Sequence, residues 1–304
     1  MVVTHGSLQS ARGRCALTIG NFDGVHRGHR ALIDRVTAKA RELGLTSCVL
    51  TFEPHRREFF ARDPAPARLT RLRDKLELMA QAGVKRVHIA RFDARFAALS
   101  AARFVEEVLV RGLGARWLLV GRDFRFGERR SGDFATLEDA SLRHGFRLEA
   151  MPDVLFDGER VSSSAVRAAL AAGDLQGAER LLGHPYTISG RVAHGAKLGR
   201  GLGFPTANIV LRRTAPISGI FAVEVDGIGR GVASVGYRPT INPVPVPLLE
   251  VHLFDWDRDL YGSHIKVRFL KKLRDEKKYD GLPALQAAIA ADAKEAREFF
   301  EAHG

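Results

Sequence analysis

Short apolar runs alternate with helical patterns through the first half of the chain, and this alternation is the strongest constraint on its fold. Four runs read as buried strands, at residues 15–19, 45–52, 84–90 and 115–120. Between the first two, one face of a helical pattern carries Leu32, Ile33, Val36, Ala40 and Leu43. Ser100 is placed to cap a later helix. Such alternation predicts βαβ units, a parallel sheet and helices on both of its faces.

The pattern changes near residue 183. Two short helical stretches precede this point, at 164–172 and 174–182. Six strand-like runs follow it, at 186–193, 204–211, 219–226, 228–236, 248–254 and 263–270. Residues 283–300 return to helical periodicity. We therefore expect an α/β domain over residues 1–183 and an antiparallel β-barrel with a C-terminal helix over residues 184–304.

The net charge of +12 over 304 residues favours polyanionic partners, either nucleic acid, an anionic membrane surface or phosphate-bearing small molecules. The densest basic cluster, residues 271–278, is interrupted by acids, so we expect no nucleic-acid partner. Cys15 and Cys48 lie in apolar runs and are expected to be buried and reduced. No run has the roughly 18 apolar residues of a membrane span, and we see no signal peptide. We expect a soluble cytoplasmic protein with no membrane partner.

Residues 20–29 (GNFDGVHRGH) leave the first predicted strand and enter the first predicted helix. Turns of this kind are where open α/β sheets bind ligands, and a helix start offers unpaired N–H groups to phosphates. Three glycines let the backbone approach a ligand closely, namely Gly20, Gly24 and Gly28. His26 and His29 would share a helix face and suit the pyrophosphate that leaves an attacked nucleotide. Read alone, the segment could also be a surface turn with exposed histidines.

A second glycine-rich segment, residues 195–208 (GAKLGRGLGFPTAN), precedes a predicted strand. Its glycines and basic residues could fold over phosphates. Thr206 and Asn208 point to the same side of an extended chain and offer hard oxygen ligands that suit Mg²⁺. Alone, it reads as a turn with satisfied polar side chains.

Glu250 lies in a strand-like run and shares a face with His252. A carboxylate there could accept the proton of an alcohol during phosphoryl transfer. The alternative is a surface glutamate on an edge strand.

Taken together, these segments resemble a known family. GNFDGVHRGH resembles the HxGH signature of nucleotidylyltransferases and is similar to the adenylyltransferase half of prokaryotic bifunctional riboflavin kinase/FAD synthetases. Four further segments follow that half's order, namely TFEPH (51–55), LTRLRDK (69–75), VGRDFRFG (120–127) and VSSSAVR (161–167). Four others resemble the kinase half, namely FPTAN (204–208), SVGYRPT (234–240), LEVHLFDWDRDLYG (249–262) and RFLKKLR (268–274). The resemblance covers nearly the whole chain.

The resemblance implies a Rossmann-like nucleotidylyltransferase domain with a parallel sheet, followed by a riboflavin kinase barrel. It assigns nucleotide and phosphate binding to Gly20, Asn21, Phe22, Asp23, Gly24, Gly28, Ser162, Ser163, Arg167, Gly195, Lys197 and Gly203. It assigns flavin binding to Asp123, Phe124, Arg125, Phe126 and Arg274. His26 and His29 would be catalytic, Glu250 would be the general base, and Thr206 and Asn208 would hold Mg²⁺.

The implied activity phosphorylates riboflavin to FMN with ATP and then adenylylates FMN to FAD with release of pyrophosphate. The expected partners are the substrates ATP, riboflavin and FMN and the product FAD, and weak homo-oligomerisation stays open. Four positions depart from the family pattern, namely Asp74, Ser164, Val166 and Ser234. Of these, Ser234 replaces the usual Asn and could slacken its loop.

The sequence argues against three alternatives. A nucleotidylyltransferase for another acceptor, such as pantetheine phosphate or nicotinamide mononucleotide, would not need the second domain. A chain that has lost one activity would not keep His26, His29, Thr206, Asn208 and Glu250 together. An RNA-binding protein would carry a basic stripe with exposed stacking aromatics, and no such string is seen.

Overall fold

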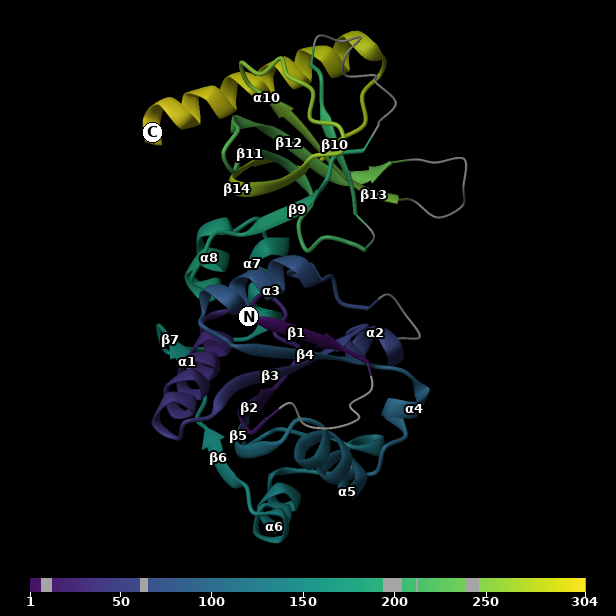
Figure 1. The fold of residues 1–304 in the computed structure, drawn as a ribbon. Helices are drawn as coiled ribbons and strands as arrows, with labels where there is room; N and C mark the ends of the chain where they lie inside the picture. Colours follow the sequence, from purple (N-terminus) through teal and green to yellow (C-terminus); the bar gives the residue numbers. More distant parts are fainter. Residues whose placement is uncertain (7–12, 61–64, 194–203, 212, 239–245, 304) are drawn as a thin grey trace. The chain divides into compact units, whose positions relative to one another are not determined.

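The computed structural model describes residues 1–6, 13–60, 65–193, 204–211, 213–238 and 246–303. Contacts along the chain divide it into two compact units. The first unit comprises Met1–Pro66 and Leu72–Val161, and the second comprises Ala67–Arg71 and Ser162–Gly304 (Figure 1).

The first unit is built on a parallel sheet with strand order β1-β4-β3-β2-β5-β6, as the alternation predicted. Its strands are β1 (Val2–His5), β2 (Cys15–Ile19), β3 (Thr46–Glu53), β4 (Arg86–Arg91), β5 (Ala115–Gly121) and β6 (Arg147–Met151). From β2 the chain passes to β3 and β4 on one side and later adds β5 and β6 on the other. The order therefore switches at β2 and β5, and the carboxyl ends of such strands are where α/β sheets bind ligands.

Helices cover both faces of this sheet (Figure 1). They are α1 (Arg27–Glu42), α2 (Arg56–Phe60), α3 (Leu72–Gln81), α4 (Ala94–Ala97), α5 (Ala101–Arg103), the π-helix η1 (Phe104–Gly112), the 3-10 helix η2 (Glu128–Arg130) and α6 (Phe134–His144). Successive residues of a strand point to opposite faces. Ala16 of β2 accordingly packs in the buried cluster of α1, whereas Leu17 packs in the buried cluster of η1. A short hairpin, β7 (Leu155–Phe156) and β8 (Glu159–Arg160), follows β6.

Ser100 caps α5, as expected, since its Oγ accepts a hydrogen bond from the backbone N of Arg103 at 3.3 Å. The helix predicted to follow begins as α5 and continues as the wider η1, which buries Phe104, Val105, Val108 and Leu109. This helix closes the sheet face that carries Leu17 and Leu118.

The second unit is an antiparallel sheet with strand order β10-β13-β12-β11-β14-β9. Its strands are β9 (Thr187–Arg191), β10 (Ala207–Val210), β11 (Gly219–Val225), β12 (Gly229–Arg238), β13 (Val246–Leu253) and β14 (His264–Arg274). A bridge between Ala193 and Asn208, with the Ala193 N donating to the Asn208 carbonyl at 2.8 Å, brings the two outer strands together. The sheet is therefore a nearly closed barrel, as predicted.

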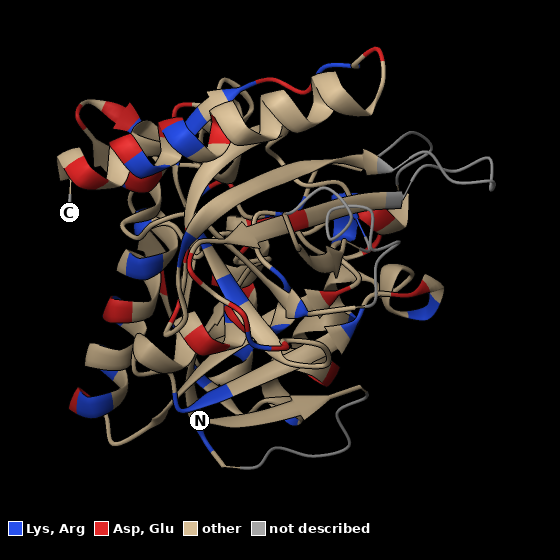
Figure 2. Ribbon diagram, turned by 90° about the horizontal axis from the view of Figure 1, so that it is seen from above, with Lys and Arg blue, Asp and Glu red and all other residues tan. Residues whose placement is uncertain are grey.

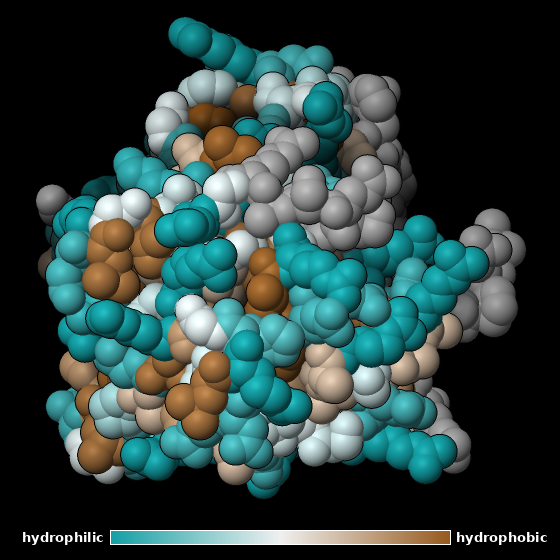
Figure 3. All heavy atoms as spheres, turned by 60° about the horizontal axis from the view of Figure 1, so that its bottom comes forward, coloured by the Kyte–Doolittle hydropathy of each residue, from teal (hydrophilic) through white to brown (hydrophobic). Residues whose placement is uncertain are grey.

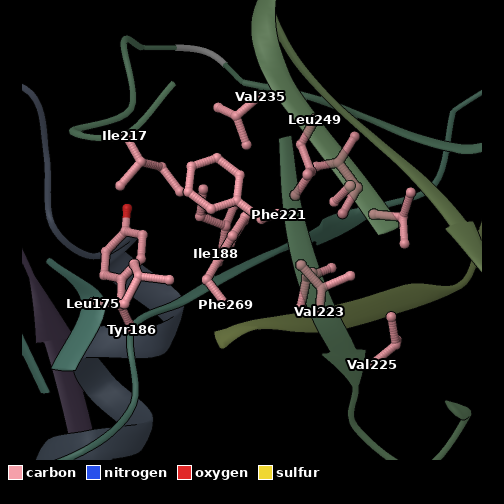
Figure 4. Packing of buried hydrophobic residues seen from close by; sticks show 14 of the residues in the cluster. Leu175, Tyr186, Ile188, Ile217, Phe221, Val223, Val225, Val235, Leu249 and Phe269 are labelled. Atoms are coloured by element: carbon pink, nitrogen blue, oxygen red, sulfur yellow. The ribbon is translucent and has the colours of Figure 1, made fainter. Parts of the chain in front are cut away.

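The barrel interior is filled by side chains from alternate strand positions, among them Tyr186, Ile188, Phe221, Val223 and Phe269 (Figure 4). The helices α7 (Ser163–Ala171) and α8 (Leu175–Leu182) belong to the same core. They contribute Val166, Leu170, Leu175, Ala178 and Leu182. The helices expected to end the first domain thus pack with the barrel strands.

The long helix α10 (Leu282–His303) covers part of the outer face of the barrel, where Ala296 and Phe300 pack on Ala222 and Val232. Cys15 and Cys48 are both buried and unpaired, as expected.

The surface carries mixed charge. In the ribbon of Figure 2, basic and acidic residues are interspersed along the described helices and strands. The face in Figure 3 is mostly hydrophilic, with apolar residues in small separate patches. Among the described residues, no helix is both long enough and apolar enough to cross a membrane.

Candidate active sites

The turn that follows β2 is held in a rare backbone conformation. Phe22 and Val25 have φ angles of 50° and 41°, which non-glycine residues seldom adopt. The Phe22 ring is fully buried, and the Thr51 hydroxyl donates to the Asn21 carbonyl at 3.2 Å. Strained residues persist where the surrounding structure fixes them, and such positions cluster at functional sites.

The other predicted residues of this turn are enclosed as well. Asp23 is 3% exposed, and Gly24 has a φ angle of 87°, which only glycine adopts readily. A Cβ atom on Gly20 would lie 3.1 Å from the Phe22 ring. The segment is therefore not the exposed surface turn that the sequence left open.

His26 and His29 stack at the start of α1, with ring centroids 3.7 Å apart and an interplanar angle of 17°. His26 is the N-cap, and its Nδ1 accepts a hydrogen bond from the backbone N of His29 at 3.3 Å. Because Nδ1 is an acceptor, a neutral His26 carries its proton on Nε2. A Cβ atom on Gly28 would lie 3.2 Å from the same Nδ1, so the absence of a side chain at Gly28 makes room for the ring.

The pKa of His29 lies well below its ordinary value, because burial disfavours the imidazolium and the charges of His26 and Lys75 add to the effect. His29 is therefore neutral near pH 7. Its Nδ1 is enclosed and has no hydrogen-bond partner among the described residues, and the same holds for the side-chain oxygen of Asn21. Buried polar atoms of this kind are costly unless a ligand or water satisfies them.

Ser162, Ser163 and Arg167 lie at the start of α7 and belong to the second unit. The Ser162 Oγ caps the helix by accepting from the Ala165 N at 3.1 Å. The Arg167 guanidinium donates to the carbonyls of Ala67 at 2.6 Å and Ser163 at 3.2 Å. These contacts hold the segment Ala67–Arg71 against α7.

The segment after β5 lines an aromatic pocket in the first unit. The rings that line it are those of Phe52, Phe60, Phe92, Phe96, Phe104, Phe124 and Phe126. Of the five predicted flavin residues, Phe124, Arg125 and Phe126 line this pocket. Asp123 does not, and its carboxylate accepts from Arg160 Nη2 at 2.9 Å.

Four arginines also line the aromatic pocket, namely Arg56, Arg125, Arg129 and Arg130. Sequence reasoning missed three of them together with Phe60, which is 60% exposed. Their only signals are two compact runs, RREFF at residues 56–60 and ERR at residues 128–130. Neither run is distinctive until the fold brings the two together.

In the second unit, Asn208 of β10, Glu250 of β13 and Ser234 of β12 form a row across three strands. Glu250 is the direct partner of Asn208 on one side and of Ser234 on the other. Directly opposed residues share a face of the sheet. Leu249 and Val251 face the barrel core, so this row lies on the outer face of the barrel.

Thr206 lies beside Asn208, as the extended backbone predicted. The Asn208 Nδ2 donates to the Thr206 carbonyl at 3.2 Å and to the Thr206 hydroxyl at 3.5 Å. The Asn208 amide oxygen is buried and has no partner within the described part of the chain. Both residues line a pocket of about 260 Å³ with the segment after β13, residues 256–261.

His252 shares the outer face with Glu250, and its Nδ1 lies 3.0 Å from the Pro205 carbonyl. This contact places His252 against the residue that precedes Thr206, where it can support the loop. Ser234, the departure from the family pattern, donates to the Glu276 carboxylate at 3.3 Å. The Ser234 side chain therefore has a hydrogen-bond partner at the position where the family usually has Asn.

Arg274 is held by a bidentate ion pair with Asp292 of α10, at 2.7 and 2.6 Å. Asp292 is 6% exposed, so the pair is largely shielded from water. It anchors α10 to the end of β14, and a role for Arg274 in flavin binding stays a prediction. Gly195, Lys197 and Gly203 lie outside the described residues.

Comparisons with known proteins match both units. A family model described as FAD synthetase matches residues 8–165, and one described as riboflavin kinase matches residues 182–300. A protein of Escherichia coli (strain K12) named bifunctional riboflavin kinase/FMN adenylyltransferase is 51% identical, over 97% of this chain and 96% of its own length. A protein of the same name from Bacillus subtilis (strain 168) is 36% identical, over 97% and 96% of the two chains.

A solved structure also matches along its whole length. It is titled as a macrolide-efflux protein from Streptococcus pneumoniae and has a TM-score of 0.82 and 27% identity, over 98% of this chain and 99% of that one. The fold, the two family models and the full-length relatives agree, and the chain belongs to the bifunctional riboflavin kinase/FMN adenylyltransferase family.

Proposed function

We propose that the chain makes FAD from riboflavin in two steps, with phosphorylation in the second unit and adenylylation in the first. The observation that carries this proposal is the coexistence of two separate polar sites. One is the stacked His26–His29 pair at the switch point of the parallel sheet. The other is the row of Asn208, Glu250 and Ser234 on the barrel.

In the first unit, a phosphate oxygen of FMN attacks the α-phosphorus of ATP, the bond to the β-phosphate oxygen breaks, and pyrophosphate leaves. The attacking oxygen is already anionic, so no general base is needed. His26 can donate through Nε2 and His29 as a neutral imidazole, and both donors favour the charge that grows on the leaving group. The resemblance alone also assigns phosphate binding to Ser162, Ser163 and Arg167, which belong to the second unit.

The aromatic pocket of the first unit suits the isoalloxazine ring of the flavin. Aromatic rings favour offset-stacked or edge-on contacts with other rings. Phe59, Phe60 and Phe92 already form edge-on pairs at 5.0 to 5.7 Å. The exposed Phe60 ring leaves a face for a planar ligand.

In the second unit, Glu250 takes the proton of the riboflavin 5′-hydroxyl as its oxygen bonds to the γ-phosphorus of ATP, and ADP leaves. An alcohol is a poor nucleophile, and a carboxylate within reach of it supplies the base. Glu250 lies beside Asn208 on the outer face of the barrel, next to the pocket that Thr206 and Asn208 line.

The residues present fit Mg²⁺. The buried, unpartnered amide oxygen of Asn208 and the hydroxyl of Thr206 are hard oxygen donors, and Mg²⁺ prefers such ligands together with waters and phosphates. Bound there, Mg²⁺ would neutralise charge on the phosphates of ATP. We further propose that the chain works in the cytoplasm.

Two variants assign the activities to the two units. His29→Ala should abolish conversion of FMN to FAD and keep phosphorylation of riboflavin. Glu250→Ala should do the reverse when FMN is supplied. His144→Ala, at the end of α6, is a matched control that should keep both activities. Retained FAD synthesis in His29→Ala would contradict the assignment.

A further inference from the structure

The aromatic pocket of the first unit is lined by more arginines than the described acidic residues pair with. Four arginines line it, and within the described part of the chain only Arg125 has an ion pair, with Asp133 at 2.7 Å. Among the described residues, Arg129 and Arg130 have no ion pair or hydrogen bond from their guanidinium groups. The Arg56 guanidinium donates one hydrogen bond to a described residue, to the Arg125 carbonyl at 3.5 Å.

Two of these arginines, Arg56 and Arg130, also repel each other. Burial lowers the pKa of Arg56 below its ordinary value, and the charges of Arg130 and Arg57 lower it further. Like charges gathered beside an apolar pocket raise the energy of the empty site. An anion bound among them would remove that repulsion.

Arg129 and Arg130 line the pocket in strained backbone conformations. Their φ angles are 51° and 62°, in the left-handed region that side chains other than Gly, Asn and Asp seldom adopt. The turn is fixed from both sides, because the Glu128 N donates to the Leu99 carbonyl at 2.7 Å and Phe126 pairs with Gly132. Two adjacent strained arginines at one pocket indicate a site in which their side chains act.

We propose that Arg56, Arg129 and Arg130 recognise the phosphate of the flavin, so that the first unit selects phosphorylated over unphosphorylated flavin. The inference rests on the proposed function, since it takes the aromatic pocket as the flavin site. The ring system lies against the phenylalanines, and the dianionic phosphate meets guanidinium donors suited to it. An uncharged flavin would leave the three arginines uncompensated.

The test is the doubly substituted chain Arg129→Gly/Arg130→Gly, assayed as the full-length protein for FAD formation from FMN. Glycine tolerates both φ angles, so the change removes charge and relieves strain. Lumiflavin has the ring system but no ribityl chain, so neither unit can convert it, and it serves as a competitive inhibitor. We expect KM for FMN to rise about tenfold to a hundredfold, with Ki for lumiflavin within twofold of the parent value.

Three further measurements test whether the change in KM comes from the charge of these arginines. Arg129→Lys/Arg130→Lys should restore most of the affinity for FMN, and Arg143→Ala, an exposed arginine of α6, should leave KM unchanged. In the parent chain, KM for FMN should rise with ionic strength more steeply than in the glycine variant.

Each contrary outcome overturns the proposal. Equal losses for FMN and lumiflavin would mean that the arginines shape the pocket instead of reading the phosphate. A rise in KM for ATP in place of FMN would assign them to the nucleotide, and unchanged constants would assign them no role. In all three outcomes the parent chain still forms FAD from FMN. The proposed function would fail only if the parent chain formed no FAD, so the two failures can be told apart.

Discussion

Asn208 and Glu250 lie directly opposite each other on β10 and β13, and Asn208 keeps its amide oxygen buried without a partner among the described residues. A fold gains nothing from such an atom, because an unsatisfied buried acceptor costs free energy. At Asn208, the proposed Mg²⁺ ligand, the amide oxygen that would serve binding therefore lowers the stability of the fold.

Asn208→Leu tests this opposition. Leucine has a similar shape and removes the unsatisfied acceptor, which offsets the loss of the two hydrogen bonds that Nδ2 donates to Thr206. The free energy of unfolding should therefore change by about 1 kcal/mol or less. Phosphorylation of riboflavin should fall at least about 100-fold, because the proposed Mg²⁺ site would lose a ligand. Urea unfolding and initial rates measure the two effects, and conversion of supplied FMN to FAD is the internal control. Full kinase activity would remove Asn208 from the site.

His29 should make the first unit sensitive to acid. Its pKa is lowered in the folded chain, so at low pH the unfolded state binds a proton that the folded state resists. Stability should therefore be lost as the pH falls below the unfolded value of about 6.5, by at most about 1.4 kcal/mol per pH unit. Urea midpoints between pH 5 and pH 7 measure the slope. His29→Gln should flatten it, and equal slopes would contradict the assignment of a neutral, enclosed His29.

Gly28→Ala should impair adenylylation without unfolding the chain. The new Cβ would lie 3.2 Å from His26 Nδ1 and 3.5 Å from the Val161 carbonyl, so the imidazole must shift. A displacement of even about 1 Å at a catalytic group can cost about 100-fold in rate. The helix itself gains up to about 1 kcal/mol from alanine, which offsets part of the crowding. The kcat/KM for FMN should fall while riboflavin phosphorylation is unchanged, and an unaffected FMN reaction would mean that the position of His26 is not critical.

Asp292→Ala should destabilise the second unit. It leaves the Arg274 guanidinium unpaired in a site where the two side chains are only 25% and 9% exposed. Breaking a fully buried pair costs about 3–5 kcal/mol, and the partial exposure of Arg274 reduces the expected loss to roughly 2–3 kcal/mol. Urea unfolding monitors the change. Glu107→Ala, which breaks the exposed pair with Arg103, should have no measurable effect. Equal effects of the two substitutions would show that the Arg274–Asp292 pair does not anchor α10.

Most of the fold could be predicted, because most of its strands and helices have a local apolar run or a helical spacing of apolar residues. The run CALTI is wholly buried as β2, and the predicted inner face of α1 buries Ile33, Val36 and Ala40. The strands β1 and β6 were missed because they are partly exposed edge strands with no continuous apolar run. The helix α6 was missed although Asp133 and Thr136 form a capping box at its start.

The candidate sites were predictable where one short segment holds the chemistry. His26 and His29 come together because they are one helical turn apart, and Thr206 and Asn208 because they are two residues apart in an extended chain. The aromatic pocket was only partly predicted, because Phe60, Phe92 and Arg130 come from segments that tertiary packing brings together. No local pattern in a single sequence records such proximity. The boundary between functional domains at residue 183 stays a proposal.

The most direct measurement is a time course of the purified chain with riboflavin, ATP and Mg²⁺, with the flavins separated by chromatography. Two activities in one chain predict that FMN appears first and FAD later, at the expense of FMN. Accumulation of FMN with no FAD would leave only the kinase. If neither product formed, and supplied FMN also stayed unchanged, the assignment of both sites would be wrong.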